Sequence, residues 1–275
     1  MSKPARAPLS AESSAVLLRE DKDGVATLTL NRPEVRNALS EALLAALISE
    51  FGAIAKDRSV RAVIVAGNGP AFCAGHDLKE MTTHRNEPDR GRAYFMALFE
   101  KCAGMMQQIM HLPQPVIASV HGIASAAGCQ IAASCDLVVA SEAARFATPG
   151  VQIGLFCSSP MVALSRKVAS NHAMEMLFTG EMVSAKRAYE MGLVNRVVSA
   201  GREREEATKL AHAIAAKSAY VQKIGKEAFY RQLDLNLADA YRYGAKVMAE
   251  NMMARDAEEG ILAFIEKRDP KWEDR

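Results

Sequence analysis

The chain has 275 residues, 49% of them hydrophobic, and its 34 Lys+Arg against 32 Asp+Glu leave a formal charge of +2. This length suits one large domain or two small ones, and a core of that size needs no disulfide or metal for stability. The near-neutral charge balance, without a long Lys/Arg run, argues against nucleic acid or an anionic membrane as partner. An anionic ligand would therefore have to meet a local basic patch.

The cysteines and the apolar runs indicate the compartment. Five widely spaced cysteines form no C-x-x-C pair, a pattern typical of free thiols in a reducing environment. No apolar run reaches the ~18 residues that a membrane span needs, and residues 1–10 lack the apolar stretch of a secretory signal. No His/Cys cluster has the spacing of metal ligands. We therefore expect a soluble cytoplasmic protein without metal, nucleic-acid partner or membrane span.

The first part of the chain predicts a hairpin, a helix and a buried strand. Residues 16–20 and 25–30 flank a turn that ends in glycine, and they predict a strand hairpin. Ser40 is a suitable N-cap for the apolar-periodic helix that follows it. The short run at 62–66 (AVIVA) is apolar throughout, which predicts a strand buried on both faces.

Two similar units then follow, each with a strand, a loop of small residues and a helix. The strand at 62–66 leads into the Gly-rich loop 67–77 and a long helix at 91–112. The strand at 116–120 leads into the loop 122–128, a short helix and another strand. Such loops leave backbone N–H groups unpaired at a helix start, where two of them can bind a carbonyl oxygen that gains charge. The same small residues could instead serve only close packing of helix and sheet.

Helical patterns dominate after Pro160, interrupted by one more strand at 193–198. A soft boundary near Ala200 divides the chain into a flexible tail (1–14), an α/β core (15–200) and a helical region (201–275). This last region carries more apolar residues than one contact face can bury, so we expect it to mediate oligomerisation.

Several short motifs occur in order along the chain. They include Asn31-Arg32-Pro33, Ala71-Phe72-Cys73-Ala74-Gly75-His76-Asp77-Leu78, His121-Gly122-Ile123-Ala124 and Gly192-Leu193-Val194-Asn195. Each is weak alone, but the combination is specific, and it resembles the crotonase (enoyl-CoA hydratase/isomerase) superfamily over nearly the whole chain. The resemblance implies an α/β fold, a crotonase-type spiral of ββα units with a helical C-terminal trimerisation region. It also implies a homotrimer or a dimer of trimers.

The same resemblance implies an acyl-CoA thioester as small-molecule substrate, with no further cofactor, in fatty-acid metabolism. Carried over by position, the backbone amides of His76 and Ala127 would form an oxyanion hole for the thioester carbonyl. The coenzyme A moiety would be bound by the matching positions Glu34, Val35, Arg36, Ala74, Lys79 and Lys267. Among these, the carbonyl of Ala74 would accept from the adenine amino group, and Lys79 would lie near the phosphates.

Two positions depart from the family pattern. A hydratase of this family uses two glutamates, one to activate water and one to deliver a proton to the α-carbon, and Gln130 and Gly150 stand in their places. Glutamine does not titrate and glycine has no side chain, while each general acid or base typically supplies ~10²–10⁴-fold. We therefore expect an enoyl-CoA hydratase-like lyase, or a related isomerase or hydrolase, whose ordinary hydration is weak or absent.

Alternatives to this interpretation remain open at the level of sequence. Another side chain could transfer protons in place of the glutamates, although each candidate also has a purely structural interpretation: His76, His121, Cys157 and Ser158. Gln130 could still orient a water through its amide. Ser125 with His121 and Asp136 could form a serine-hydrolase triad, although no G-x-S-x-G elbow is present. The main rival to an enzyme is a catalytically silent acyl-CoA binder or oligomeric regulatory protein.

Overall fold

The structure is a computed structural model that describes residues 15–275. The tail predicted for residues 1–14 lies outside the described residues. The strands are β1 (Leu17–Lys22), β2 (Val25–Leu30), β3 (Ala62–Gly67), β4 (Ala71–Cys73), β5 (Val116–Val120), β6 (Ile123–Ser125), β7 (Leu137–Ser141), β8 (Arg145–Ala147), β9 (Val183–Ser184) and β10 (Arg196–Val198).

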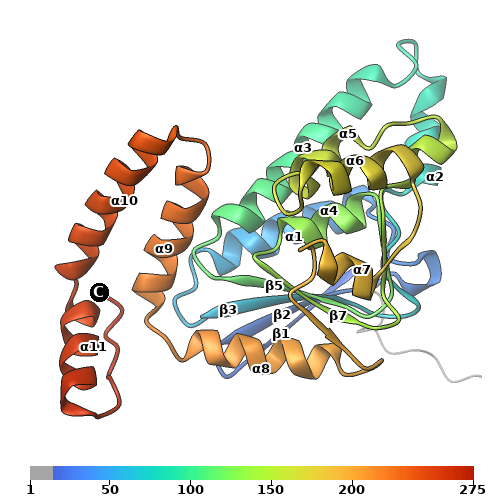
Figure 1. Ribbon diagram of the computed structural model, residues 1–275. Helices are drawn as coiled ribbons and strands as arrows, with labels where there is room; N and C mark the ends of the chain where they lie inside the picture. Colours follow the sequence, from blue (N-terminus) through green and yellow to red (C-terminus); the bar gives the residue numbers. More distant parts are fainter. Residues whose placement is uncertain (1–14) are drawn as a thin grey trace, which may run out of the picture.

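The helices are α1 (Glu41–Ile54), α2 (Leu78–Thr83), α3 (Arg92–His111), α4 (Ala127–Ser134), α5 (Ser158–Leu164), α6 (Ser170–Thr179), α7 (Ala185–Glu190), α8 (Glu203–Ala215), α9 (Ala219–Gln232), α10 (Leu237–Met252) and α11 (Arg255–Glu266). Short 3₁₀ turns lie at Pro33–Val35, His84–Asn86 and Pro149–Ile153. Figure 1 shows the helices on both sides of the large sheet and the last three helices beside it.

Two sheets are linked by a repeated ββα unit. The larger has the order β1-β2-β3-β5-β7-β10, and the smaller has the order β4-β6-β8-β9. After β3, β5 and β7 the chain crosses from the larger sheet into the smaller one, as β4, β6 and β8, before it enters a helix. The predicted hairpin is confirmed by the antiparallel pair β1–β2, whereas β2, β3, β5 and β7 pair in parallel.

The strand β3 is buried on both faces, as its uninterrupted apolar run predicts. Val63 and Val65 belong to the main core beneath α1, α3 and α4. Ala62 and Ile64 belong to a second core cluster on the opposite face, which includes residues of α8. Alternate residues of a strand point to opposite faces, so β3 needs apolar residues at every position. The predicted N-cap is also confirmed, since the Ser40 side chain accepts from the Leu43 amide at 3.2 Å.

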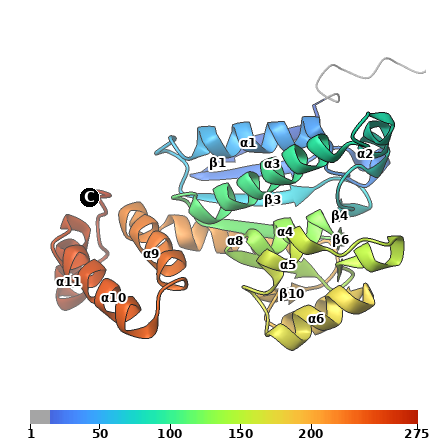
Figure 2. The ribbon, with the colours of Figure 1, turned by 90° about the horizontal axis from the view of Figure 1, so that it is seen from above.

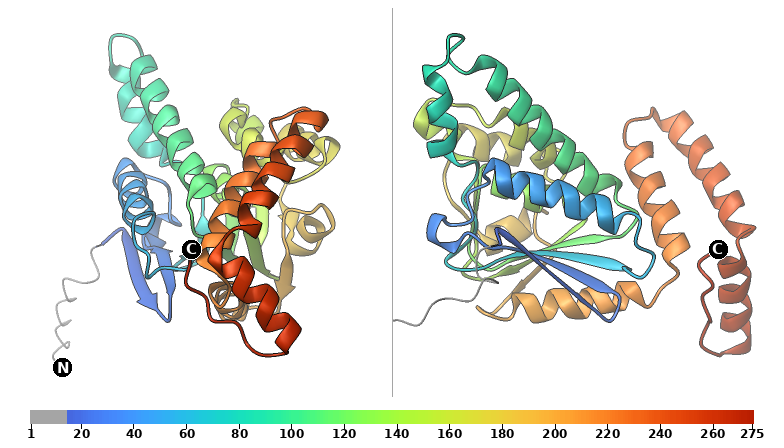
Figure 3. Two further views of the ribbon diagram at one scale, coloured as in Figure 1. Left: turned by 90° about the vertical axis from the view of Figure 1, so that its left-hand side faces the viewer. Right: turned by 180° about the vertical axis from the view of Figure 1, so that it is seen from behind.

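The helical region after residue 200 divides into two parts that pack differently. Helix α8 packs across the large sheet through Ala207 and Ala211, which are fully buried. Helices α9, α10 and α11 project away from one end of the sheet, at the end opposite α2 (Figures 2 and 3). The division expected near Ala200 stays a prediction; in the structure, α8 follows this point in the chain and packs on the core. The core and the projecting helices meet between α8 and α9.

A buried polar cluster fastens α9 to the core. The Lys226 ammonium, whose side chain is 7% exposed, donates to Asp136 Oδ2 at 2.7 Å and to two backbone carbonyls at 3.0 Å. The Tyr230 hydroxyl donates to Asp136 Oδ1 at 2.8 Å, and the Val116 amide donates to Oδ2 at 2.7 Å. Burial lowers the pKa of Lys226 and raises that of Tyr230. These bonds give Asp136 a structural role.

Candidate active site

A cavity of about 430 Å³ lies where the two small-residue loops meet the loop after β8. Four of the predicted site residues line it: Ala74, His76, Ala127 and Gly150. Most of the remaining lining is apolar and includes Leu78, Met81, Phe99, Ile153, Leu155 and Phe156. A mostly apolar cavity with a few polar groups is typical of a small-molecule site.

The two loops touch one another at this cavity. A Cβ placed on Gly75, which has φ +100°, would lie 2.9 Å from Ala126 Cβ and 3.6 Å from the Ala127 nitrogen. Ala127 is the first residue of α4, and the first amides of a helix have no intrahelical acceptor. Within residues 15–275, no backbone carbonyl accepts from the amide of His76 or of Ala127. Both N–H groups are therefore available to a ligand.

Ala126 holds the second loop in an unusual conformation. It precedes α4 with φ +49° and ψ −115°, a combination that L-residues other than glycine rarely adopt and that costs of order 1–3 kcal/mol. The next residue, Ala127, thereby begins the helix with its amide at the cavity wall. No feature of the amino-acid type predicts this strain, because the residue is an alanine where the conformation favours glycine.

Gly128 allows helix and sheet to pack closely, which was the alternative explanation for the small residues in these loops. A Cβ at this position would lie 2.1 Å from the Cys73 carbonyl oxygen and 2.8 Å from its carbon. Helix α4 therefore rests directly on β4, and only glycine allows this approach. Small residues in the two loops thus serve both purposes: Gly128 allows the packing, and the packing places the Ala127 amide.

The His76 side chain lies against the cavity in a mainly apolar setting. Its ring meets the Phe99 ring edge-on, with 5.6 Å between the centroids. Its Nδ1 atom is buried and has no hydrogen-bond partner among the described residues. Burial lowers the pKa of His76, so the ring is neutral near pH 7. Neutral imidazole can accept a proton, which keeps a role in proton transfer chemically open.

The two positions that the resemblance matches to the glutamates of a hydratase are both buried. Gln130 is 4% exposed, lies on α4 outside the cavity lining, and has an unpaired Oε1. Gly150 lines the cavity, but a Cβ on it would lie 2.7 Å from the Leu155 carbonyl oxygen and 2.9 Å from Cys157 Sγ. The Gly150 amide donates to that sulfur at 3.3 Å. The loop 150–157 has thus closed over the space that a side chain at position 150 would need.

The predicted coenzyme A positions fall into two groups. Glu34, Val35 and Arg36 belong to a 3₁₀ turn, or directly follow it, and the Arg36 carbonyl accepts from the Ala74 amide at 3.0 Å. Lys79 is exposed on the first turn of α2. Lys267 directly follows α11, which lies at the other end of the molecule from α2 (Figure 2). Within one chain, Lys267 is therefore not brought together with the other positions.

The residues of the alternative hydrolase triad lie apart. Asp136 bonds to the Val116 amide at the first residue of β5, whereas His121 follows the last residue of that strand. A strand rises ~3.3 Å per residue, so Val116 and His121, five residues apart, are separated by roughly 16 Å. His121 Nε2 is paired with the Gly69 carbonyl at 2.9 Å. Ser125 lines the cavity without either partner, which argues against a Ser-His-Asp site.

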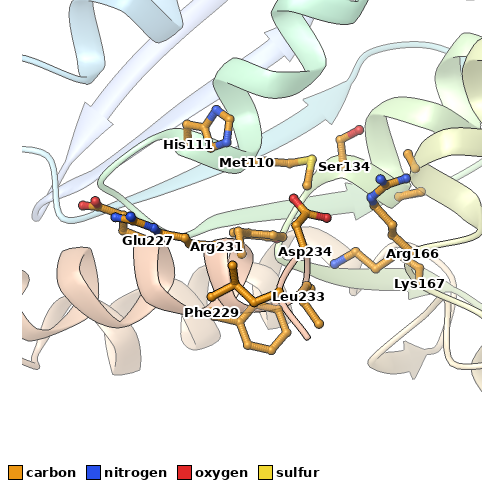
Figure 4. Close-up of a pocket in the computed structure, with 14 residues that line it drawn as sticks. Met110, His111, Ser134, Arg166, Lys167, Glu227, Phe229, Arg231, Leu233 and Asp234 are labelled. Carbon is orange, nitrogen blue, oxygen red and sulfur yellow. The ribbon is translucent and has the colours of Figure 1, made fainter. Parts of the chain in front are cut away.

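A second cavity, of about 740 Å³, lies between α9 and the ends of α3 and α4 (Figure 4). Helix α4 runs from the first cavity, which Ala127 lines, to the second, which Ser134 lines. Arg166 and Lys167 face the second cavity opposite α9. None of the predicted site residues lines it. The candidate active site is therefore the smaller cavity, which holds both unpaired amides.

Comparisons with known proteins identify the family of the chain. The family model "Enoyl-CoA hydratase/isomerase" matches residues 20–275. The chain belongs to this family. Enoyl-CoA hydratase domain-containing protein 3, mitochondrial, of Rattus norvegicus is 45% identical over 251 residues, covering 91% of this chain and 82% of the relative. A probable enoyl-CoA hydratase of Rhizobium meliloti is 34% identical and covers 96% of this chain and 100% of the relative.

Solved structures of enoyl-CoA hydratases show the same fold. An enoyl-CoA hydratase from Mycobacterium smegmatis has a TM-score of 0.89 at 53% identity, over 94% of this chain and 98% of that chain. Human enoyl-CoA hydratase domain-containing protein 3 has a TM-score of 0.88 at 43% identity, over 94% and 100%. The crotonase-type α/β fold expected from the sequence motifs is thereby confirmed.

The comparisons bear on the expected compartment as well. Five relatives, from rat, human, frog, mouse and zebrafish, carry the word mitochondrial in their names. These names give no support to the cytoplasmic location predicted from the cysteines. In the part of the chain that the structure describes, no helix is long and apolar enough to cross a membrane.

Proposed function

We propose that this protein binds an acyl-CoA thioester and stabilises the enolate of its acyl group, as part of fatty-acid or acyl-CoA metabolism. The observation that carries the proposal is the pair of unpaired amides, of His76 and Ala127, in contacting loops at one cavity. A thioester oxygen that accepts from both would be stabilised as it gains charge, and losing one such donor usually costs ~3–4 kcal/mol. The apolar side chains of the cavity suit an acyl chain.

We do not expect the protein to hydrate enoyl-CoA efficiently. Gln130 lies off the cavity and cannot act as a base, and the closed loop 150–157 leaves no space for a carboxylate at position 150. Each lost acid or base should lower the rate by ~10²–10⁴-fold. We expect crotonyl-CoA hydration to be far slower than in a family member with both glutamates, measured by the loss of enoyl absorbance. A comparable rate would refute this part of the proposal.

A titration with acyl-CoAs distinguishes an enzyme from a catalytically silent binder. Calorimetry with a panel of acyl-CoAs should show binding, because the determinants are backbone amides and exposed cations rather than the missing glutamates. Binding without any exchange or turnover of the acyl group would favour the silent binder. The absence of affinity for coenzyme A and every acyl-CoA would refute the ligand itself.

Lys79 offers a test of the coenzyme A moiety. Its exposed ammonium on α2 would meet the phosphates in solvent, where a single charge contact is weak and is screened by salt. We expect Lys79→Ala to weaken acyl-CoA binding roughly two- to fivefold at low ionic strength, and less in high salt. Lys56→Ala, on the exposed chain after α1, is the matched control and should leave the affinity unchanged. Equal acyl-CoA affinities of the Lys79→Ala and Lys56→Ala variants would show that Lys79 does not contact the coenzyme A moiety.

We further propose that the protein is a homotrimer or a dimer of trimers, assembled through α9–α11. Large apolar side chains on these helices are exposed in the single chain, among them Leu237 at 75%, Met248 at 65% and Phe264 at 85%. Exposed apolar area of this kind marks an interface. The distance of Lys267 from α2 within one chain agrees with a contribution to the site of a neighbouring subunit.

Replacing Phe264 with aspartate tests this assembly. Because the side chain is exposed in the single chain, the change should leave the fold intact while it places a charge in the proposed contact. We expect sedimentation to show dissociation toward monomers, with an unchanged circular dichroism spectrum. Lys246→Asp, on the exposed polar part of α10, is the control. A monomeric wild-type protein would contradict the assembly directly.

A further inference from the structure

The candidate active site contains few groups that can move a proton. Of the side chains that line it, only His76 and Cys157 titrate. In the described chain, neither position that carries glutamate in a hydratase supplies a carboxylate to this cavity. If the enolate of the proposed function forms here, the proton that leaves the substrate must pass through one of these two side chains or through water.

Cys157 occupies the space of the missing glutamate side chain. Its sulfur lies 2.9 Å from the point where a Cβ of residue 150 would stand. The Gly150 amide donates to this sulfur at 3.3 Å, which holds the side chain in place and would stabilise negative charge on it. The side chain is mostly buried, with 7% exposed, and it lines the cavity. The thiol therefore stands beside the position from which a hydratase delivers its proton.

Ser125 adds a polar group to the lining of the same cavity. This residue is 7% exposed and lines the cavity beside Ala126 and Ala127. Its hydroxyl is not one of the fully buried unpaired atoms of residues 15–275, so it is open to the cavity. There it can hydrogen-bond to a polar group of a ligand. A thioester or its enolate has such polar atoms.

We propose that the Cys157 thiol is the proton-transfer group of this site and exchanges a proton with the α-carbon of a bound acyl-CoA. This assignment rests on the proposed function, which supplies the substrate. The resting thiol first releases its proton to solvent water, and the thiolate then takes the α-proton. The electron pair of the C–H bond forms the enolate, whose charge is carried by the oxygen held by the two amides. The thiol then returns a proton to the same carbon after exchange with solvent.

The step is balanced and needs no other reactant. In the forward step one C–H bond breaks and one S–H bond forms, and in the return step the S–H bond breaks and the C–H bond forms again. The proton that the resting thiol released to solvent is taken up again at the end, so nothing is oxidised or reduced. Burial raises the pKa of Cys157, which keeps the resting group as a thiol and makes the proton available to an enolate. Because no carboxylate of the described residues lines the cavity to activate a water as in a hydratase, the expected chemistry is α-proton exchange or isomerisation rather than hydration.

The test uses the full-length protein with butyryl-CoA in D₂O and measures deuterium at the α-carbon by mass spectrometry. We expect exchange by the wild type and a loss of ~10²-fold or more in Cys157→Ser. Serine can still accept from the Gly150 amide, so the loop should keep its shape, and Cys157→Ala provides a second variant. Calorimetry with butyryl-CoA should give affinities within about threefold of the wild type for both, a difference of ~0.7 kcal/mol.

Cys102 provides the matched control, because it is a buried thiol on α3 that does not line the cavity. Cys102→Ala should retain the exchange rate. Exchange at the wild-type rate in Cys157→Ser would overturn the assignment, as would a wild type that binds butyryl-CoA and exchanges no faster than a protein-free solution. Failure of the wild type to bind butyryl-CoA would instead overturn the proposed function, and the assignment with it.

Discussion

Replacing Asp136 with alanine should lower the free energy of unfolding by ~3–5 kcal/mol, the usual loss when one partner of a buried ion pair is removed. The Lys226 ammonium would remain buried without a counter-charge, and the Tyr230 hydroxyl and the Val116 amide would each lose their acceptor. Because this cluster joins α9 to the core, we also expect the last three helices to lose their fixed position. Urea denaturation monitored by circular dichroism measures the first effect.

The control for this change is an exposed ion pair. Glu205 contacts Arg202 and Lys209 on the surface of α8, where such pairs contribute little. Glu205→Ala should leave the unfolding curve unchanged. An equal, small effect for both variants would show that the Asp136 cluster is not what fastens α9. The double variant Asp136→Ala/Lys226→Met should recover part of the loss, since it removes the uncompensated charge together with its partner.

Gly128→Ala should disable the site by moving its helix. The new methyl group would lie 2.1 Å from the Cys73 carbonyl oxygen, which is backbone and cannot turn aside, so α4 must shift away from β4. Overpacking of this kind costs ~1–3 kcal/mol. The shift also displaces the Ala127 amide, and we expect acyl-CoA affinity to fall by at least tenfold. Calorimetry and thermal denaturation report the two effects separately.

Gly104 is the matched glycine for this experiment. It lies within α3, and a Cβ there meets nothing within 4 Å. Gly104→Ala should raise the free energy of unfolding by up to ~1 kcal/mol through helix propensity and should leave ligand affinity unchanged. If Gly128→Ala bound acyl-CoA as the wild type does, the amide of Ala127 would not be a binding determinant.

The elements that the sequence predicts well are those with a clear pattern of apolar residues. The strands β3, β5 and β7 are short apolar runs, and α3 is a long periodic segment that ends before Pro113. The three-residue strands β4 and β6 were missed, because their alanines, cysteine and serine do not differ from loop residues. Neighbouring strands decide their conformation, as tertiary context often does for β-structure.

The sequence predicts the parts of the candidate site that consist of backbone groups at small residues. The positions of the two amides followed from the motif resemblance, and the structure brings both to one cavity. The strain at Ala126 and the closure of Cys157 over Gly150 could not be predicted, because both depend on backbone conformation and on contacts between distant loops. The packing of α8 was missed for a related reason: alanines face the sheet there, and they give only a weak apolar pattern.

During synthesis, one face of the large sheet stays uncovered until α8 has left the ribosome. Strands β2, β3 and β5 are complete by residue 120, yet Val25, Ile64 and Ile117 on this face are covered by Ala207 and Ala211. At ~5–20 residues per second, the nascent chain carries this apolar surface for several seconds. The nascent protein should therefore be most prone to aggregation in that interval, and chains stalled before residue 203 should bind holdase chaperones more strongly than chains stalled after residue 250.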